Sequence, residues 1–408
     1  MVLAQATGVI DRSLTAVVAP GLQATFQLDD TGFGLIHGPA YAIVHAAGLL
    51  VVGLYVDRLD RFRLMGLGVL GWTLGNLICA LAGSIEVFVL GRMLMGTAQA
   101  VFMPAAVALI LDRAPSGRAG LALSAFTAAS ATGRSAAMIL GGAGLALIGL
   151  IAGSQTMLAG IEDWRALLLL SCAPNLLLAA ALLTLNDTGR TGSRERARVW
   201  RWMADRAAMI APHGLAAVCV VLLTHAATAW GPSLLHRAHG FGQAEAGLAM
   251  GFGILAGAPL GHLLGGWGVD RLRALGRPEG LLLAVALAAA GGAGVWLGAA
   301  PSPAQAIVAY GLLAACLAVA SLTALAVFAG LGPPGGRGGA AAVFFALTSL
   351  VGATAGPPLV GLVSDARLSA LGGQLGGAVA IVVAAASGVG VLAALASLHA
   401  GRRRGVAT

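Results

Sequence analysis

The chain has 408 residues, of which 58% are hydrophobic and only 10% are charged. Soluble domains use roughly 45–50% apolar and about 25% charged residues, so this composition excludes an ordinary soluble protein and indicates a membrane protein. The formal net charge is +8, but the arginines stand in short gaps between apolar runs rather than in a basic groove with aromatic residues, so no nucleic-acid partner is expected.

Twelve long apolar runs follow one another along the chain. A helix that crosses a bilayer needs about 20 mainly apolar residues, and each run reaches roughly that length. The predicted spans cover about 3–26, 32–55, 64–85, 86–111, 119–151, 164–186, 207–231, 244–267, 279–299, 303–331, 338–363 and 374–399. Because lipid offers the backbone no hydrogen bonds, these spans must be helices. The first run carries Asp11 and Arg12 and lacks a small-residue cleavage site, so we expect a retained span and not a signal peptide.

No enzymatic, metal or cofactor site is expected. The four cysteines lie inside apolar runs without a paired spacing, which predicts neither disulfides nor zinc; they are Cys79, Cys172, Cys219 and Cys316. The sequence contains no lysine, so it cannot form the phosphate-binding loop of an ATP-driven pump. It also lacks a His-Glu-x-x-His helix and a Gly-x-Ser-x-Gly elbow, which argues against an intramembrane hydrolase.

The distribution of arginine predicts the orientation. Eighteen arginines lie in the loops after the even-numbered spans and in the C-terminal tail, against three in the opposite loops, Arg165, Arg237 and Arg367. Basic residues in short loops stay on the cytoplasmic side, so both termini are predicted to be cytoplasmic. The polar residues 187–206 form either a solvated linker or a short amphipathic helix at the inner membrane face.

A charged loop motif occurs twice. The first copy has Gly53, Asp57 and Arg58, and the second has Gly266, Asp270 and Arg271, a little over half the chain later. A motif repeated at this distance indicates a duplicated unit. The predicted organisation is a six-helix bundle over 1–186, a cytoplasmic linker over 187–206 and a second six-helix bundle over 207–408.

Twelve spans in two halves with this motif resemble the major facilitator superfamily over essentially the whole chain. The first copy of the motif, continued by Arg61, matches that superfamily's loop between spans 2 and 3, except that Asp60 replaces a glycine. The resemblance implies an all-α membrane protein that works by alternating access.

The same loops suggest a conformational latch. An aspartate at a helix end can bind free backbone N–H groups, and arginines can clamp carboxylates or lipid phosphates. We therefore expect the following residues to hold the cytoplasmic ends together in one state: Gly53, Asp57, Arg58, Arg61, Asp270 and Arg271. The alternative is that the arginines only set the topology.

A narrower resemblance begins at Asp11. The run from Asp11-Arg12 to Gly34-Leu35, together with Arg92, Gly96 and Pro104, is similar to spinster-type lipid transporters and the related anion:cation symporters. The resemblance implies a lipid-like cargo. It also implies that Asp11, Arg12 and Arg92 couple the movement of the cargo to protons.

Physical chemistry supports a role for these charges. An ionisable group near the bilayer centre costs about 2.5–3.5 kcal/mol on insertion scales and generally marks function. Adjacent helical residues do not face each other, so Asp11 is predicted to pair with Arg92 or Arg134 rather than with Arg12. This ion pair would open when Asp11 is protonated; a permanent structural pair is the alternative.

The predicted substrate site contains Gln99, His37, Tyr41, His225 and Arg134. Spinster-like proteins often carry a glutamate where this chain has Gln99, and an amide cannot titrate. Either Asp11 carries the coupling alone, a histidine substitutes, or transport does not use protons. A guanidinium at Arg134 can grip a carboxylate or phosphate with two hydrogen bonds, which favours an anionic cargo; snorkelling or pairing with a backbone carbonyl is the alternative.

These features predict a secondary active transporter for an amphiphilic or organic anion, coupled to protons. A multidrug-type efflux carrier is the alternative, as is a sensor with the transporter fold that binds without transport, which the amide at Gln99 favours. The expected partners are the small substrate, protons and membrane lipids. A monomer in a bacterial inner membrane is expected.

Overall fold

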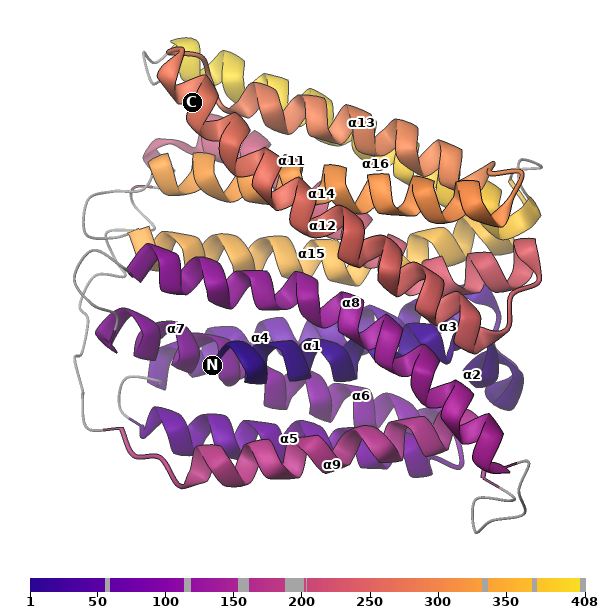
Figure 1. Ribbon diagram of the computed structural model, residues 1–408. Helices are drawn as coiled ribbons and strands as arrows, with labels where there is room; N and C mark the ends of the chain where they lie inside the picture. The colour runs from indigo at the N-terminus through magenta and orange to yellow at the C-terminus, as the bar shows by residue number, and fades with distance from the viewer. Residues whose placement is uncertain are drawn as a thin grey trace. The chain divides into compact units, whose positions relative to one another are not determined.

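The structure, a computed structural model, describes residues 1–55, 59–113, 119–152, 161–187, 202, 204–331, 337–368 and 373–403, and these ranges contain helices and no strand. The helices are labelled in Figure 1: α1 (Val2–Val17), α2 (Ala19–Phe26), α3 (Asp30–His37), α4 (Pro39–Tyr55), α5 (Arg61–Leu81), α6 (Ile85–Ala100), α7 (Phe102–Arg113), α8 (Ala119–Ala152), α9 (Asp163–Leu183), α11 (Ala207–His239), α12 (Gln243–Ala274), α13 (Gly280–Gly298), α14 (Pro303–Leu331), α15 (Arg337–Asp365) and α16 (Gly373–Arg403).

Ten of the described helices or helix segments are long and apolar enough to cross a membrane, or eleven if the bent pair α1–α2 counts as one span. The bend between α1 and α2 is 57°. It falls at Val18, and Pro20 follows in the first turn of α2, where its missing N–H costs no helical hydrogen bond. The predicted second span, 32–55, is divided into α3 and α4, with Gly38 between them and Pro39 opening α4. The count of twelve spans remains a prediction.

The chain divides into two compact units. Unit 1 comprises residues 1–192 and 231–252, and unit 2 comprises residues 193–230 and 253–408. Unit 1 therefore contains α1 to α9 with the end of α11 and the start of α12. The predicted sequence boundaries, 1–186 and 207–408, stay a prediction.

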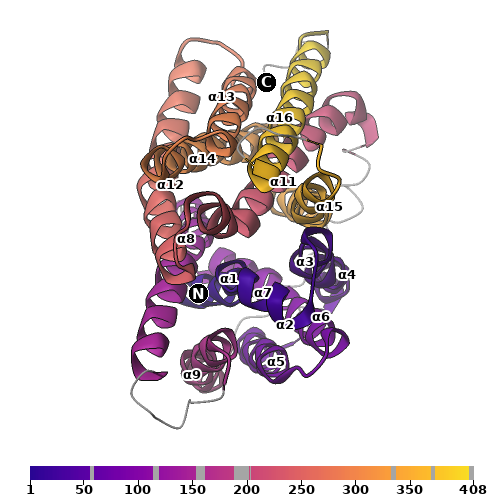
Figure 2. The same ribbon diagram turned by 90° about the vertical axis from the view of Figure 1, so that its right-hand side faces the viewer.

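In unit 1, α5 packs against α6 and α9, α1 packs against α8, and α4 packs against α6 (Figure 2). Glycine allows the last of these contacts. A Cβ atom at Gly96 of α6 would collide with the backbone carbonyl oxygen of Tyr41 on α4. Small residues allow this close approach of membrane helices, and here it brings the polar side chains of α4 and α6 together.

In unit 2, α13 packs against α14 and α16. Gly356 of α15 meets the Leu222 carbonyl of α11 in the same close manner. Nε2 of buried His213 donates to the Ala324 carbonyl oxygen at 2.8 Å, and the ring stacks near Phe328 and Phe344. This histidine is thus part of an aromatic core.

Large apolar side chains also cover much of the protein surface. Leu150, Leu177, Leu263, Trp267 and Leu392 are each about 70% exposed or more. A soluble protein rarely leaves such patches in water. A lipid bilayer would cover them, in agreement with the composition.

Candidate functional site

The first polar cluster of unit 1 surrounds Asp11, in the middle of α1. Its carboxyl group is buried, at 1% exposure, and its Oδ2 accepts a hydrogen bond of 2.7 Å from Nδ2 of Asn175 on α9. The side chains of Ser171 and Trp72 are further neighbours of this carboxyl group. Asn76 of α5 donates to the Ser171 hydroxyl at 2.6 Å and so extends the cluster.

The predicted ion pair between Asp11 and Arg92 is not formed in the described part of the chain. The two residues lie on helices that are linked by another contact: Arg92 Nη1 donates to the backbone carbonyl of Arg12 at 3.4 Å. Asp11 instead turns toward the neutral amide of Asn175. Sequence spacing placed the charges on neighbouring helices but did not give the direction in which each side chain points.

Arg92 is almost completely buried, at 1% exposure, and its partners are backbone carbonyls and an aromatic ring. Nη2 donates to the His37 carbonyl at 2.9 Å. This carbonyl lies at the end of α3, where the helix stops before Gly38 and Pro39 and last-turn carbonyls need other donors. The guanidinium carbon lies 5.4 Å from the centre of the Tyr41 ring, within cation–π range.

Tyr41 connects several of the predicted substrate-site residues. Its hydroxyl donates to Gln99 Oε1 at 2.7 Å, and Gln99 Nε2 donates to the Gly8 carbonyl at 2.9 Å. His45 stacks on the same ring and contacts the Gly96 carbonyl at 3.1 Å. The amide that replaces the family's glutamate is therefore bound on both its oxygen and its nitrogen.

Arg12 gives the same tyrosine a second cation. Its guanidinium carbon lies 6.0 Å from the centre of the Tyr41 ring, and the side chain is half-buried. The second polar cluster of unit 1 thus consists of Arg12, His37, Tyr41, Arg92 and Gln99. It has two guanidinium groups on one aromatic ring, and Asp11 points into the other cluster.

The remaining predicted substrate-site residues have different surroundings. His37 Nδ1 lies 3.0 Å from the Thr15 hydroxyl, which fixes this ring against α1. His225 belongs to unit 2, where Nδ1 contacts the carbonyl of Val221 in its own helix at 2.9 Å. Arg134 is half-buried on α8, and its convergence with Arg12 and Arg92 stays a prediction.

The predicted latch is described only in part. Asp57 and Arg58 lie outside the described residues, and Gly53 lies near the end of α4. Asp270 and Arg271 are exposed near the end of α12. Arg61 has a specific partner that the sequence analysis missed: Asp187, which follows α9.

The ion pair of Arg61 and Asp187 lies within unit 1. The Nε–Oδ2 distance is 2.5 Å, and both side chains are buried. Asp60, which stands where the family has glycine, caps α5 by accepting from the Arg63 N–H and also accepts from the Asp187 N–H. Slight burial acts to raise the pKa of Asp60, but these hydrogen bonds outweigh it and hold the pKa below its usual value. The Asp60 substitution therefore supplies a helix cap.

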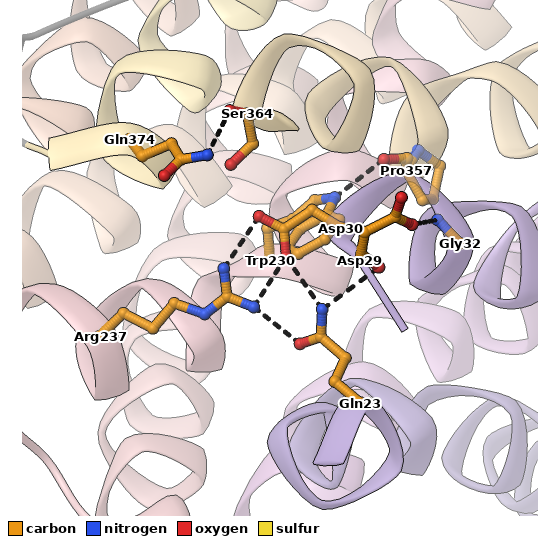
Figure 3. A network of polar contacts seen from close by, with 9 residues as sticks. All are labelled: Gln23, Asp29, Asp30, Gly32, Trp230, Arg237, Pro357, Ser364 and Gln374. Atoms are coloured by element: carbon orange, nitrogen blue, oxygen red, sulfur yellow. Dashed lines mark hydrogen bonds and ion pairs between the residues drawn. The ribbon is translucent and has the colours of Figure 1, made fainter. Parts of the chain in front are cut away.

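A third polar group joins α2, α3 and the end of α11 within unit 1 (Figure 3). Arg237 forms two hydrogen bonds to the Asp30 carboxylate, at 2.9 and 2.7 Å, and a third to Gln23 Oε1 at 2.7 Å. Gln23 Nε2 also donates to Asp30 at 2.9 Å. Asp29 caps α3 by accepting from Gly32 N–H at 2.6 Å. In the sequence Arg237 contributes only to the predicted orientation, and this ion pair was not predicted.

Figure 3 also draws two contacts within unit 2. The indole N–H of Trp230 donates to the Pro357 carbonyl at 2.9 Å, and Gln374 donates to the Ser364 carbonyl at 2.7 Å. They fasten α11 and α16 to α15. Both contacts bond side chains to backbone carbonyls, so they add no charged site.

Exchanging Gly96 for alanine is expected to separate α4 from α6 and to destabilise the protein by about 1–3 kcal/mol, because the added Cβ has no room beside the Tyr41 carbonyl. The apparent melting temperature in detergent measures the loss. Gly149→Ala is the matched control, since a Cβ there meets nothing within 4 Å. Equal melting temperatures for the two variants would contradict the close helix contact.

Comparison with known proteins agrees with this fold. A sequence profile described as Major Facilitator Superfamily matches residues 1–357. An MFS-type efflux pump of Mycolicibacterium smegmatis is 26% identical over 404 residues, which are 94% of this chain and 87% of the pump. The uncharacterized MFS-type transporter EfpA of Mycobacterium tuberculosis is 29% identical over 140 residues, which are 34% of this chain and only 26% of EfpA.

Among solved structures, a bacterial homologue of the human lysosomal transporter Spinster, in an inward-facing and occupied conformation, has a TM-score of 0.80 at 22% identity. The match covers 98% of this chain and 95% of that protein. At this identity the similarity is one of fold.

The relatives in these comparisons are transporters, and the match spans only about a quarter of the length of EfpA. The apolar helices make it an integral membrane protein. The helical fold, the intramembrane charges and the profile match over residues 1–357 together establish that the chain belongs to the Major Facilitator Superfamily.

Proposed function

We propose that the protein is a secondary active transporter that moves an amphiphilic or organic anion by alternating access, driven by protons. The observation that carries this proposal is the buried guanidinium of Arg92, which contacts two backbone carbonyls and the Tyr41 ring and has no carboxylate partner among the described residues. A buried charge is costly in a membrane and is generally kept for function. An uncompensated cation favours an anionic cargo.

The second polar cluster offers complementary groups for such a cargo. Arg12 adds a second positive charge beside Tyr41. Gln99, Tyr41 and His37 supply hydrogen-bonding groups around the two cations. Arg134 is proposed as a third cation, and His225 is proposed as a further substrate-binding residue. The apolar surroundings of these helices suit the hydrocarbon part of an amphiphile.

Asp11 is the proposed proton carrier. It is buried, and its hydrogen-bond partner is a neutral amide instead of an arginine. No direct ion pair with an arginine stabilises the carboxylate of Asp11. A proton can therefore bind to Asp11 without breaking an ion pair. Gln99 cannot titrate, which supports Asp11 as the acidic group that carries the coupling, with Arg12 and Arg92 as its cationic neighbours.

The wider arrangement is part of the same proposal. Twelve spans form two six-helix bundles, 1–186 and 207–408, joined by the cytoplasmic linker 187–206. Both termini are cytoplasmic in a bacterial inner membrane, and the protein works as a monomer among membrane lipids. Arg61 and the other latch residues stabilise one of the two alternating states. The ion pair of Arg61 with Asp187 supports a structural role for Arg61 within unit 1.

A multidrug-type efflux carrier is the second candidate function. The efflux pump of Mycolicibacterium smegmatis, similar over 94% of this chain, favours it. Such a carrier would accept cationic and neutral amphiphiles as well as anions. The charge preference of transport therefore separates the two candidates.

The test is Arg92→Gln in proteoliposomes under an imposed pH gradient. The probes are a fluorescent fatty-acid anion and its neutral methyl ester. We expect the variant to lose at least about tenfold of its transport rate for the anion, corresponding to about 1.4 kcal/mol, and little for the ester. The matched control is Arg277→Gln, an exposed arginine outside both polar clusters.

Equal losses for both probes in Arg92→Gln would contradict an anion site at this residue. Preferred transport of a cationic dye by the unmodified protein would favour the efflux carrier. Binding of the anion without movement across the membrane would identify a sensor.

A further inference from the structure

Asn175 has an unusual hydrogen-bonding state. It lies on α9 with 0% of its surface exposed, and its Nδ2 donates to Asp11 at 2.7 Å. Its Oδ1, however, is buried without a hydrogen-bond partner in the described part of the protein. An unsatisfied buried acceptor costs roughly 1–3 kcal/mol. The site therefore keeps a vacant acceptor next to a buried carboxyl group.

The vacant acceptor matches what Asp11 needs after it binds a proton. An ionised carboxylate only accepts hydrogen bonds, whereas a carboxylic acid also has one O–H donor. A primary amide carries a donor and an acceptor on the same carbon, so it can serve both forms. In the deprotonated form Nδ2 of Asn175 donates to Asp11, as the structure has it. In the protonated form Oδ1 can accept the new O–H.

We propose that Asn175 is the positioning residue for the proton on Asp11: its amide donates to the carboxylate and accepts from the carboxylic acid, so that both protonation states are held in one buried place. The proton comes from a hydronium ion of the solvent: one O–H bond of that ion breaks, the O–H bond of Asp11 forms, and a water molecule is released. In the protonated form the acid and the amide make a paired set of two hydrogen bonds. This inference rests on the proposed proton coupling and names a residue that carries it out.

The signals of other titratable and charged groups on elements around α1 must be distinguished from the signal of Asp11. They are Arg12 on α1 itself, Cys79 on α5, Cys172 on α9, Arg92 on α6, Arg134 on α8, His37 on α3 and His45 on α4. Arginine does not lose its proton in proteins, and a thiol absorbs in a different infrared region from a carboxyl group. A free imidazole titrates near neutral pH, so the measurement must identify the carboxyl group itself.

The test is infrared difference spectroscopy of the full chain in lipid nanodiscs, titrated with pH and without any cargo. The unmodified protein is expected to show a carboxylic C=O band that is absent in Asp11→Asn. In Asn175→Leu the band is expected to remain at higher pH, by about one unit, because a hydrogen bond to a charged acceptor is stronger than one to a neutral group. Its frequency should also rise, because the acid loses its acceptor.

Two further variants make the result specific. Asn175→Ser keeps a donor and an acceptor on a smaller side chain. It is expected to bring the titration part of the way back to that of the unmodified protein. This variant also replaces Asn175→Leu in the test if Asn175→Leu does not fold. Thr323→Val removes an equally buried polar side chain of unit 2, whose hydroxyl donates to the Val319 carbonyl of its own helix, and should leave the titration at the unmodified pH.

An unchanged titration and frequency in both Asn175 variants would overturn the inference, and so would the absence of any band that depends on Asp11. Because the measurement uses no cargo, its outcome is independent of the transport assay. Loss of the proposed transport function with an intact spectral effect would refute the carrier and leave the pairing of Asp11 with Asn175.

Discussion

Replacing Asp11 with asparagine is expected to abolish accumulation driven by a pH gradient while exchange of cargo across the membrane continues. Asparagine has nearly the same shape and still offers an oxygen to Asn175 Nδ2, so the fold should persist. An amide cannot bind and release a proton in this pH range, so the gradient no longer drives the cycle. The carrier can still change state with cargo bound on both sides.

The measurement uses proteoliposomes loaded at one pH and diluted into another, with a fluorescent fatty-acid anion as probe. Gradient-driven uptake should fall to the level of protein-free liposomes, and counterflow of preloaded probe should stay within about twofold of the unmodified protein, a difference below roughly 0.5 kcal/mol in the barrier. Asp163→Asn, an exposed aspartate in the first turn of α9, is the matched control. Full gradient-driven uptake by Asp11→Asn would remove this residue from the coupling.

Replacing Arg237 with glutamine is expected to destabilise unit 1. The substitution removes both charge-assisted hydrogen bonds to Asp30, whose side chain is only 7% exposed. Breaking a buried pair typically costs 3–5 kcal/mol, because the remaining charge is left without a countercharge. Arg237 is 36% exposed, so solvent screening reduces the expected loss to about 1–3 kcal/mol.

The apparent melting temperature in detergent, checked by the retention of a single peak in size-exclusion chromatography, measures the effect. The double variant Asp30→Asn with Arg237→Gln should recover part of the loss, because no buried charge then remains unpaired. The pair of Arg273 and Glu279, whose side chains are 50% and 15% exposed, provides a control, and Arg273→Gln should cost less than about 1 kcal/mol. Identical melting temperatures for the unmodified protein and Arg237→Gln would show that the pair contributes nothing.

Apolar length was enough to locate the helices. Every predicted span corresponds to a described helix or to two consecutive helices, because about 20 apolar residues in lipid have few alternatives to a helix. The break inside residues 32–55 was visible as Gly38-Pro39, and the bend in the first span as Pro20. Neither was predicted, because a proline in a membrane helix often leaves it continuous.

The polar partners were harder to predict than the helices. Charge complementarity suggested that Asp11 would bind Arg92 or Arg134, whereas the structure pairs Asp11 with Asn175 and Arg92 with backbone carbonyls. Asparagine carries no charge, so it gave no signal in an apolar run. Backbone carbonyls become available only where helices end, which requires the break at Gly38 to be known first.

Distance along the chain hid the other partners. Arg61 meets Asp187 and Arg237 meets Asp30 across more than a hundred residues. Each of these charges had a sufficient local explanation, namely membrane orientation or loop composition. A pairwise signal from many related sequences would be needed to find such contacts before the structure.

The contact between Arg92 and the His37 carbonyl has one more consequence. Nη1 and Nη2 of this guanidinium each donate to a main-chain oxygen, whereas Nε has no partner among the described residues. An arriving anion must compete for them, and whenever it wins, the terminal oxygen of α3 gives up its donor. Binding of the cargo would then remove the hydrogen bond that holds the end of α3, and the connection between α3 and α4 would become more mobile.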